Sequence, residues 1–222
     1  MSDLANEKNI TIDISEIKKE KKSYLLLKRC TDILGSLGGL LFLSILFLII
    51  AICIKVEDPK GKVFFKQLRV GKDGKEFYMY KFRSMVANAE DKLNELLEMN
   101  EVDGAMFKMK NDPRVTNIGR FIRRTSIDEL PQLYNVLKGE MSLVGPRPPL
   151  PREVAEYTNF DKQRLLVVPG CTGLWQISGR NELNFNQMVD LDLQYIKNRT
   201  LLFDIQIIIK TVICMVKKDG AY

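Results

Sequence analysis

Two adjacent carboxylates, Asp128 and Glu129, lie in a part of the sequence that also carries arginines and a proline. Arg123 and Arg124 come a few residues before them, and Pro131 follows two residues after Glu129. Arginines beside a helix N-terminus can bind phosphate, because guanidinium groups and free backbone N–H groups both match phosphate oxygens. Carboxylates directed at a phosphate repel it unless a cation lies between them or one carboxylate attacks the phosphorus. The segment is therefore a candidate site for chemistry on a phosphate group.

A purely structural interpretation of the same residues competes with this one. In a capping box, Ser126 would be the N-cap of a helix and Glu129 its N3 residue, each bonded to the other's backbone. Pro131 would then lie inside the helix, where it forfeits a hydrogen bond. With Asp128 as the N-cap, Pro131 falls in the first turn, where its missing N–H costs little. Judged on these residues alone, capping is favoured over catalysis.

Further basic residues could supply positive charge to such a site. Lys81 and Arg83 end an expected strand, Arg147 lies in a Gly-Pro-Arg-Pro turn, and Arg180 lies in a Ser-Gly-Arg loop. A solvated surface charge is the alternative for each of them. Arg147 fits that alternative least, because the flanking prolines fix its direction without giving it a structural partner. A pyrophosphate substrate would account for several of these cations together.

The amino-acid composition limits the kinds of catalysis that the chain could perform. The 222 residues include no histidine, which excludes Ser-His-Asp and Cys-His catalysis and most catalytic zinc sites. The four cysteines form no CxxC pair, so we expect free thiols. Catalysis would rest on Asp, Glu, Lys, Arg or hydroxyl groups, together with a divalent cation. The net charge of +6 is weak evidence for an anionic partner.

An apolar block near the N-terminus is predicted to be a membrane anchor. Between Ile33 and Ile54 only Ser36 and Ser44 are polar, and a helix of this length measures roughly 33 Å, enough to span a bilayer core. Basic residues flank both ends of the block. Because basic flanks tend to stay in the cytoplasm, a helix that enters and returns on one face is favoured. An interfacial helix and a plain span are the alternatives.

The remainder predicts an α+β fold that is mainly helical. Residues 63–69 and 76–82 flank a Gly-Lys-Asp-Gly turn and are expected to form a small β-hairpin. Apolar spacing predicts short amphipathic helices. They are expected at 85–100, 152–168, 185–198 and 201–217. Two more short helices are expected to meet at Thr125–Ser126. The helix at 201–217 has the pattern of a helix at a membrane surface or in a core.

Blocks of sequence from about residue 25 to the C-terminus match one known family in order. They are KRCTDILGS, YKFRSM, DPRVTNIGRFIRRTSIDELPQLYNVLKGEMSLVGPRP, PGCTGLWQISGRN and DLDLQYIKN. The chain resembles the bacterial sugar transferases, monotopic phosphoglycosyl transferases that start polysaccharide and glycoconjugate assembly on polyprenyl phosphate. The stretch from DELPQL to GPRP is highly specific. This resemblance makes catalysis the favoured interpretation of Asp128 and Glu129.

The resemblance implies transfer of a sugar 1-phosphate from a UDP-sugar to polyprenyl (undecaprenyl) phosphate. The products would be polyprenyl-diphospho-sugar and UMP, in the first membrane step of exopolysaccharide, capsule or glycoconjugate synthesis. Asp128 would be the nucleophile of a two-step ping-pong reaction, and Glu129 would bind Mg²⁺. The further site residues are Lys81, Arg123, Arg147 and Arg180 for phosphate groups, and Asp192 at a further acidic position.

The membrane helix departs from the family pattern. Family members usually carry a Ser-Pro pair there, whereas this chain has Ser44-Ile45 and loses the most reliable kink. Gly38 and Gly39 could loosen the helix instead. The resemblance still implies a re-entrant anchor and a site at the cytoplasmic face of the bacterial cell membrane, in contact with membrane lipids. The expected units are a mobile leader (1–22), the anchor (23–55) and a cytoplasmic transferase domain (56–222).

Two other classes of function are alternatives to the transferase. A non-enzymatic membrane scaffold of polysaccharide machinery would be expected to lack the acidic pair or Arg147, and both are present. No nucleic-acid partner is expected, because beyond the leader the basic residues are dispersed among acids and do not cluster with exposed aromatics. The sequence leaves open the sugar, the polymer and the oligomeric state, a homo-oligomer included.

Overall fold

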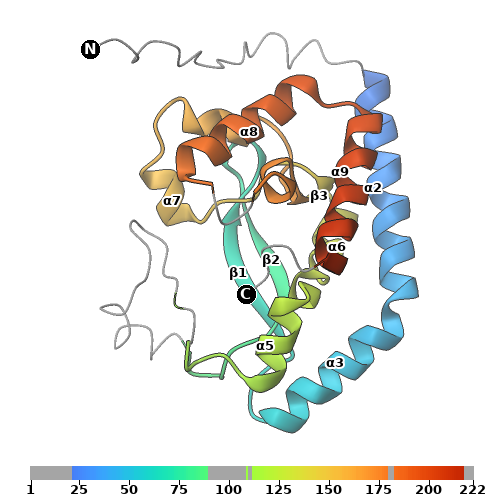
Figure 1. Ribbon diagram of the computed structural model, residues 1–222, viewed down its shortest axis with the longest axis vertical. Helices are drawn as coiled ribbons and strands as arrows, with labels where there is room; N and C mark the ends of the chain where they lie inside the picture. The colour runs from blue at the N-terminus through green and yellow to red at the C-terminus, as the bar shows by residue number, and fades with distance from the viewer. Residues whose placement is uncertain (1–21, 90–108, 110–111, 180–182, 218–222) are drawn as a thin grey trace.

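The computed structural model describes residues 22–89, 109, 112–179 and 183–217 (Figure 1). The leader up to residue 21, Arg180 and most of the expected helix at 85–100 lie outside the described residues. Within the described part, the fold is mainly helical with two two-stranded sheets. The mainly helical α+β prediction is therefore confirmed.

The apolar block folds as two helices rather than one. Helix α2 runs over Lys22–Phe42 and α3 over Ser44–Glu57, and the two are bent by 58°. Among the described residues, no single helix is long and apolar enough to cross a membrane, although the bent pair meets these criteria when both helices are counted together.

The bend lies at Leu43 and not at the glycines that were expected to loosen the helix. A Cβ on Gly35 would lie 2.7 Å from Leu143 Cδ1, and one on Gly39 would lie 3.0 Å from Leu133 Cδ1. These two glycines therefore let α2 pack closely against neighbouring elements. Of the two glycines expected to loosen the helix, Gly39 thus serves packing, whereas a Cβ on Gly38 would meet nothing within 4 Å. Helix α2 continues unbroken through both.

The expected hairpin is confirmed. Strand β1 covers Phe64–Val70 and β2 covers Glu76–Phe82, paired antiparallel from Phe64 opposite Phe82 to Val70 opposite Glu76. The turn η1 (Lys72–Gly74) joins them. A second sheet was not predicted: β3 (Ser142–Val144) pairs in parallel with β4 (Gly170–Thr172). Strands of three residues are too short to show an alternating pattern.

The helices around the sheets agree with the sequence in part. Helices α8 (Phe185–Asn198) and α9 (Leu201–Lys217) begin and end as predicted. The expected helix at 152–168 is wrong, since the structure has α7 (Pro151–Ala155) and the 3-10 turn η4 (Asp161–Leu166). Between them Asp161 accepts hydrogen bonds from both the N–H and the hydroxyl of Thr158. Local side-chain bonds of this kind compete with a continuous helix.

Three apolar clusters hold the elements together. The largest joins α8, α9 and β3, and includes Leu193, Tyr195 and Ile207. A second joins α3, β2 and α5 (Asn117–Arg124) through residues that include Phe82 and Ile122. The third lies between β2 and α6 (Gln132–Lys138). Strand β2 contributes to two of the clusters, so Lys81 near its end is held on a rigid strand. In Figure 1, α2 and α9 lie side by side along one edge of the molecule.

Candidate active site

Asp128 and Glu129 lie in a 3-10 turn, η3 (Ile127–Glu129), between α5 and α6. Ser126, just before it, has a left-handed backbone (φ 55°) and makes no side-chain capping bond. Helix α6 begins at Gln132 with Pro131 as its N-cap residue. Both capping interpretations are therefore wrong, because neither Ser126 nor Asp128 caps α6. Pro131 loses nothing at a helix start, where its missing N–H would have no intrahelical partner.

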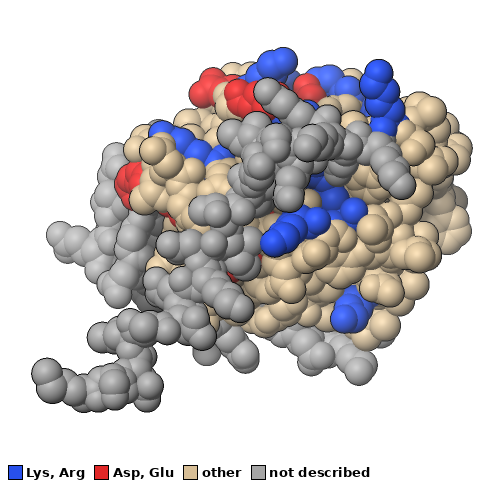
Figure 2. Space-filling view, turned by 90° about the horizontal axis from the view of Figure 1, so that it is seen from above, with Lys and Arg blue, Asp and Glu red and all other residues tan. Residues whose placement is uncertain are grey.

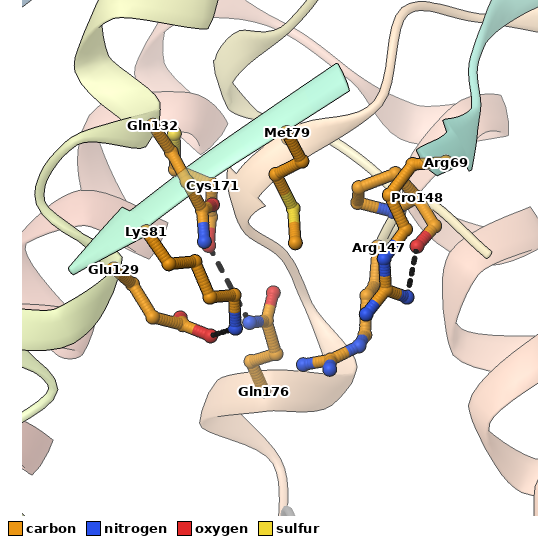
Figure 3. Close-up of a pocket in the computed structure, with 10 residues that line it drawn as sticks. Arg69, Met79, Lys81, Glu129, Gln132, Arg147, Pro148, Cys171 and Gln176 are labelled. Atoms are coloured by element: carbon orange, nitrogen blue, oxygen red, sulfur yellow. Dashed lines mark hydrogen bonds and ion pairs between the residues drawn. The ribbon is translucent and has the colours of Figure 1, made fainter. Parts of the chain in front are cut away.

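Glu129 forms an ion pair with the lysine that ends the hairpin. Lys81 Nζ lies 2.7 Å from Glu129 Oε1, and both side chains are partly exposed. They line a pocket whose charged and amide residues are Arg69, Lys81, Glu129, Gln132, Arg147 and Gln176. Figure 3 shows the guanidinium of Arg147 across this pocket from the Lys81–Glu129 pair. Within the described residues, that guanidinium has no hydrogen bond or ion pair.

The pocket contains an arginine that sequence reasoning missed. Arg69 is buried, and its Nη1 donates to the carbonyl of Pro148 at 2.9 Å (Figure 3). Burial, together with the nearby charge of Arg147, lowers the pKa of Arg69 to about 10. In the sequence, Arg69 is only one of the basic residues that follow the apolar block. The only sign in the sequence that Arg69 could be buried is its place in a strand, directly before the apolar residue Val70.

The two carboxylates are in different electrostatic states. Burial raises the pKa of Asp128 to about 6, although the charges of Lys81 and Arg123 oppose that rise. Burial also acts to raise the pKa of Glu129, but Lys81 and Arg147 outweigh it and hold that pKa well below its usual range. Glu129 therefore stays ionised across the physiological range, whereas Asp128 holds a proton more tightly. Opposite shifts in a neighbouring pair are typical of sites where two carboxyl groups have different roles.

The remaining predicted site residues fall into three cases. Arg123 is close enough for its charge to interact with Asp128, and its Nε donates to Ser84 Oγ at 2.9 Å. Asp192 does not line the pocket. It is fully buried on α8, 2.6 Å from Arg164 Nη2. Arg180 lies outside the described residues. The structure thus brings together Lys81, Arg123, Asp128, Glu129 and Arg147.

The carboxylates of the site could bind Mg²⁺ together with a substrate, but protein groups alone do not form a complete magnesium site. Among the described residues, no three Cys, Asp or Glu side chains are grouped as metal ligands. Mg²⁺ often binds through one or two carboxylates together with substrate phosphates and water. Glu129, which is ionised and borders the pocket, fits that mode of binding.

Comparisons with known proteins identify the family of the chain. Residues 23–218 match the family described as bacterial sugar transferase. The chain is 48% identical over 206 residues to the galactosyl transferase CpsE of Streptococcus agalactiae serotype III, a match that covers 92% of this chain and 45% of that protein. It is also 48% identical to the undecaprenyl-phosphate galactose phosphotransferase of Salmonella typhimurium, covering 91% and 43%.

A shorter relative is matched along most of its length. The chain is 41% identical over 199 residues to the exopolysaccharide production protein ExoY of Rhizobium meliloti, with 88% of each chain covered. The chain thus spans less than half the length of the first two relatives and most of the third. The match covers most of this chain at high identity, and the chain belongs to the bacterial sugar transferase family.

Proposed function

We propose that the protein transfers a sugar 1-phosphate from a UDP-sugar to undecaprenyl phosphate or a similar polyprenyl phosphate. The observation that carries this proposal is the pocket between the Lys81–Glu129 pair and Arg147, whose guanidinium forms no ion pair with any described residue. A diphosphate between them would give Arg147 its anion. Relatives named as a galactosyl transferase and a galactose phosphotransferase support a hexose as the sugar.

The first half-reaction uses Asp128 as the nucleophile. Its carboxylate oxygen attacks the β-phosphorus of the UDP-sugar, and the bond between this phosphorus and the bridging oxygen breaks. UMP leaves with the electron pair, and the sugar phosphate stays bound to Asp128. Lys81 and Arg147 hold the phosphate oxygens, and Arg123 lies on the Asp128 side of the site. A pKa of about 6 leaves Asp128 mostly ionised at neutral pH and more basic than an ordinary aspartate.

The second half-reaction restores the enzyme. A phosphate oxygen of the polyprenyl phosphate attacks the same phosphorus, the bond to Asp128 breaks, and polyprenyl-diphospho-sugar is released. Glu129 would hold Mg²⁺, which when bound neutralises diphosphate charge and lets a carboxylate approach. No histidine is needed, because the attacking groups are oxygen anions that are already ionised.

The bent helix pair supports a re-entrant anchor at the cytoplasmic face of the bacterial cell membrane. Large apolar side chains point outward on both sides of the bend, where Phe42 is 87% exposed and Ile45 is 72% exposed. Helix α9 also exposes apolar residues, including Leu202 and Ile209. In Figure 2, the right-hand surface over α2 and α9 is largely uncharged. Lipid would cover such a surface, and a lipid-soluble acceptor would reach the site from it.

UMP release tests the proposal. The purified full chain in detergent should release UMP from at least one UDP-hexose when Mg²⁺ and undecaprenyl phosphate are both present. Without acceptor, a radiolabelled sugar phosphate should remain attached to the protein, and Asp128→Asn should abolish the label. Near-normal turnover by Asp128→Asn would refute the covalent mechanism. A folded protein that releases no UMP from any UDP-sugar would favour the scaffold alternative.

A further inference from the structure

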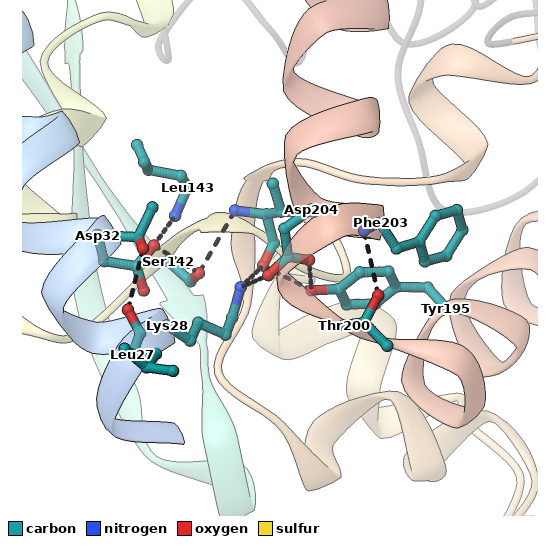
Figure 4. Close-up of polar contacts among 11 residues, drawn as sticks. Leu27, Lys28, Asp32, Ser142, Leu143, Tyr195, Thr200, Phe203 and Asp204 are labelled. Atoms are coloured by element: carbon teal, nitrogen blue, oxygen red, sulfur yellow. Dashed lines mark hydrogen bonds and ion pairs between the residues drawn. The ribbon is translucent and has the colours of Figure 1, made fainter. Parts of the chain in front are cut away.

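Two charged residues of α2 contact the backbone of β3 (Figure 4). Asp32 Oδ1 accepts hydrogen bonds from Ser142 Oγ and from the N–H of Leu143, both at 2.9 Å. One turn earlier on the helix, Lys28 Nζ donates to the carbonyl of Val144 at 3.0 Å. Helix α2 therefore holds three consecutive residues of one short strand.

The same lysine belongs to a buried ionic cluster that joins α2 to α9. Lys28 Nζ lies 2.7 Å from Asp204 Oδ2, and the Tyr195 hydroxyl donates to Asp204 Oδ1, also at 2.7 Å. The side chains of Lys28 and Asp204 are 15% and 6% exposed. Buried ion pairs contribute little net stability compared with apolar residues of similar size, because both ions lose their hydration. Their clearer effect is to fix geometry, and here the fixed object is the carbonyl end of β3.

Strand β3 leads directly into the turn that carries Arg147. Val144 is followed by Gly145 and Pro146, and then by Arg147. The Gly145 N–H donates to Thr172 on β4 at 2.9 Å. Beyond Arg147, the hairpin holds the turn through Arg69 and Pro148. Arg147 thus lies between two tethers, one from β1 and one that runs through β3 to α2.

We propose that Asp32 and Lys28 are positioning residues of the transfer reaction, which fix β3 so that Arg147 reaches the donor diphosphate. The inference rests on the proposed function, in which Arg147 binds phosphate. It gives the anchor helix a role in the site besides anchoring. A helix that only anchored the chain would not require a buried carboxylate and an ammonium group directed at the strand before Arg147.

The test measures how Asp32 and Arg147 depend on each other. Asp32→Ala should raise KM for the UDP-sugar about tenfold, with a smaller change in kcat, because a shift of about 1 Å in a positioned group has effects of this order or larger. Asp32→Asn keeps an acceptor for Leu143 and should restore KM to within about threefold of the starting protein. Asp190→Ala removes an exposed carboxylate on α8 and serves as the matched control.

A double-mutant cycle separates positioning from general damage. If Asp32 acts through Arg147, adding Asp32→Ala to Arg147→Ala should change KM less than about twofold further. If the two substitutions instead raise KM independently, so that their effects multiply in the double variant, the positioning role is overturned and the proposed function stays intact. An unchanged KM in Arg147→Ala alone would refute phosphate binding by Arg147, and the positioning role with it.

Milder variants keep the test valid if Asp32→Ala does not fold. Ser142→Ala removes one of the two donors to Asp32 and leaves the backbone bond, so KM should rise about threefold. That rise should vanish in the Arg147→Ala background. For the lysine, Lys28→Met combined with Asp204→Asn keeps the cluster neutral, and its KM effect should likewise depend on Arg147. If neither Ser142→Ala nor the double variant of Lys28 and Asp204 changes KM, the proposal is overturned.

Discussion

The molecule contains two clusters of charged side chains that differ in how their charges are matched. In the cluster of Lys28, Asp204 and Tyr195, each group has a partner at 2.7 Å and little exposure. At the pocket, Lys81 and Glu129 form an ion pair, but the guanidinium of Arg147 has none among the described residues. Asp128, next to Glu129 in the chain, is buried with a raised pKa. Matched charges fix the arrangement of elements, whereas unmatched charges are held ready for a ligand. The two clusters should therefore respond oppositely to mutation.

Removing the carboxylate of Asp128 should cause the largest loss of activity, and it should raise the stability of the fold. We expect Asp128→Asn to lower turnover by about 10⁴-fold or more, because no other group replaces the nucleophile. Ionising this buried carboxyl disfavours the folded state at neutral pH. The variant should therefore be at least as stable as the starting protein, with a gain of up to about 3 kcal/mol at pH 7.5.

UMP release and thermal unfolding, measured on the same preparation, check both halves of this expectation. Asp190→Asn, on the exposed face of α8, is the control and should change neither quantity. A marked loss of stability in Asp128→Asn would show that its carboxylate is matched like those of the other cluster.

Breaking the matched cluster should mainly affect stability. Lys28→Met leaves Asp204 buried with the Tyr195 hydroxyl as its remaining side-chain partner. We expect a loss of about 3 kcal/mol in the free energy of unfolding, more than a hundredfold in the folding equilibrium. Lys138→Met breaks a more exposed ion pair with Glu140 and should cost less than about 1 kcal/mol. Thermal unfolding of the two variants side by side measures the contrast, and equal losses would contradict it.

The sequence predicted the elements whose information is local. The hairpin follows from two runs of aromatic and β-branched residues around Gly71–Gly74. Helices α8 and α9 follow from apolar spacing that continues to their ends. The acidic pair and Arg147 were identified from residue types and family blocks. The structure brings them to one site because β2, η3 and the turn after β3 converge there.

Features that depend on distant contacts were missed. Ser126 takes a left-handed backbone beside Ile127, which packs on the cluster of α3, β2 and α5. The local pattern could not show this, so the capping box was predicted in error. The role of Arg69 depends on a contact with Pro148, 79 residues away. The bend at Leu43 occurs without proline. Of the two glycines expected to cause it, Gly39 packs against Leu133, and a Cβ on Gly38 would meet nothing within 4 Å.

Arg147 should contribute to activity and hardly at all to the stability of the fold. Because it has no hydrogen bond or ion pair within the described part of the chain, Arg147→Ala should leave the unfolding temperature nearly unchanged. We expect kcat/KM for the UDP-sugar to fall about 100-fold, and Arg147→Lys to recover part of it, since an ammonium restores the charge but not the fork. Arg120→Ala, an exposed arginine on α5, is the matched control. A large drop in the unfolding temperature would place Arg147 among the matched, structural charges.

The pH dependence should give the smallest effect and still separate the clusters. With a pKa of about 6, Asp128 is about one-tenth ionised at pH 5, so the burst of UMP in the first half-reaction should be about tenfold slower than at pH 7.5. The folded-state pKa is raised above the unfolded value of 3.8, so protonating Asp128 stabilises the fold as pH falls from about 6 toward 4. Slower chemistry should therefore not coincide with unfolding caused by this group. Glu129 stays ionised throughout, because its pKa is lowered. A burst rate that stays flat down to pH 5 would assign the attack to a group with an ordinary pKa rather than to the buried Asp128.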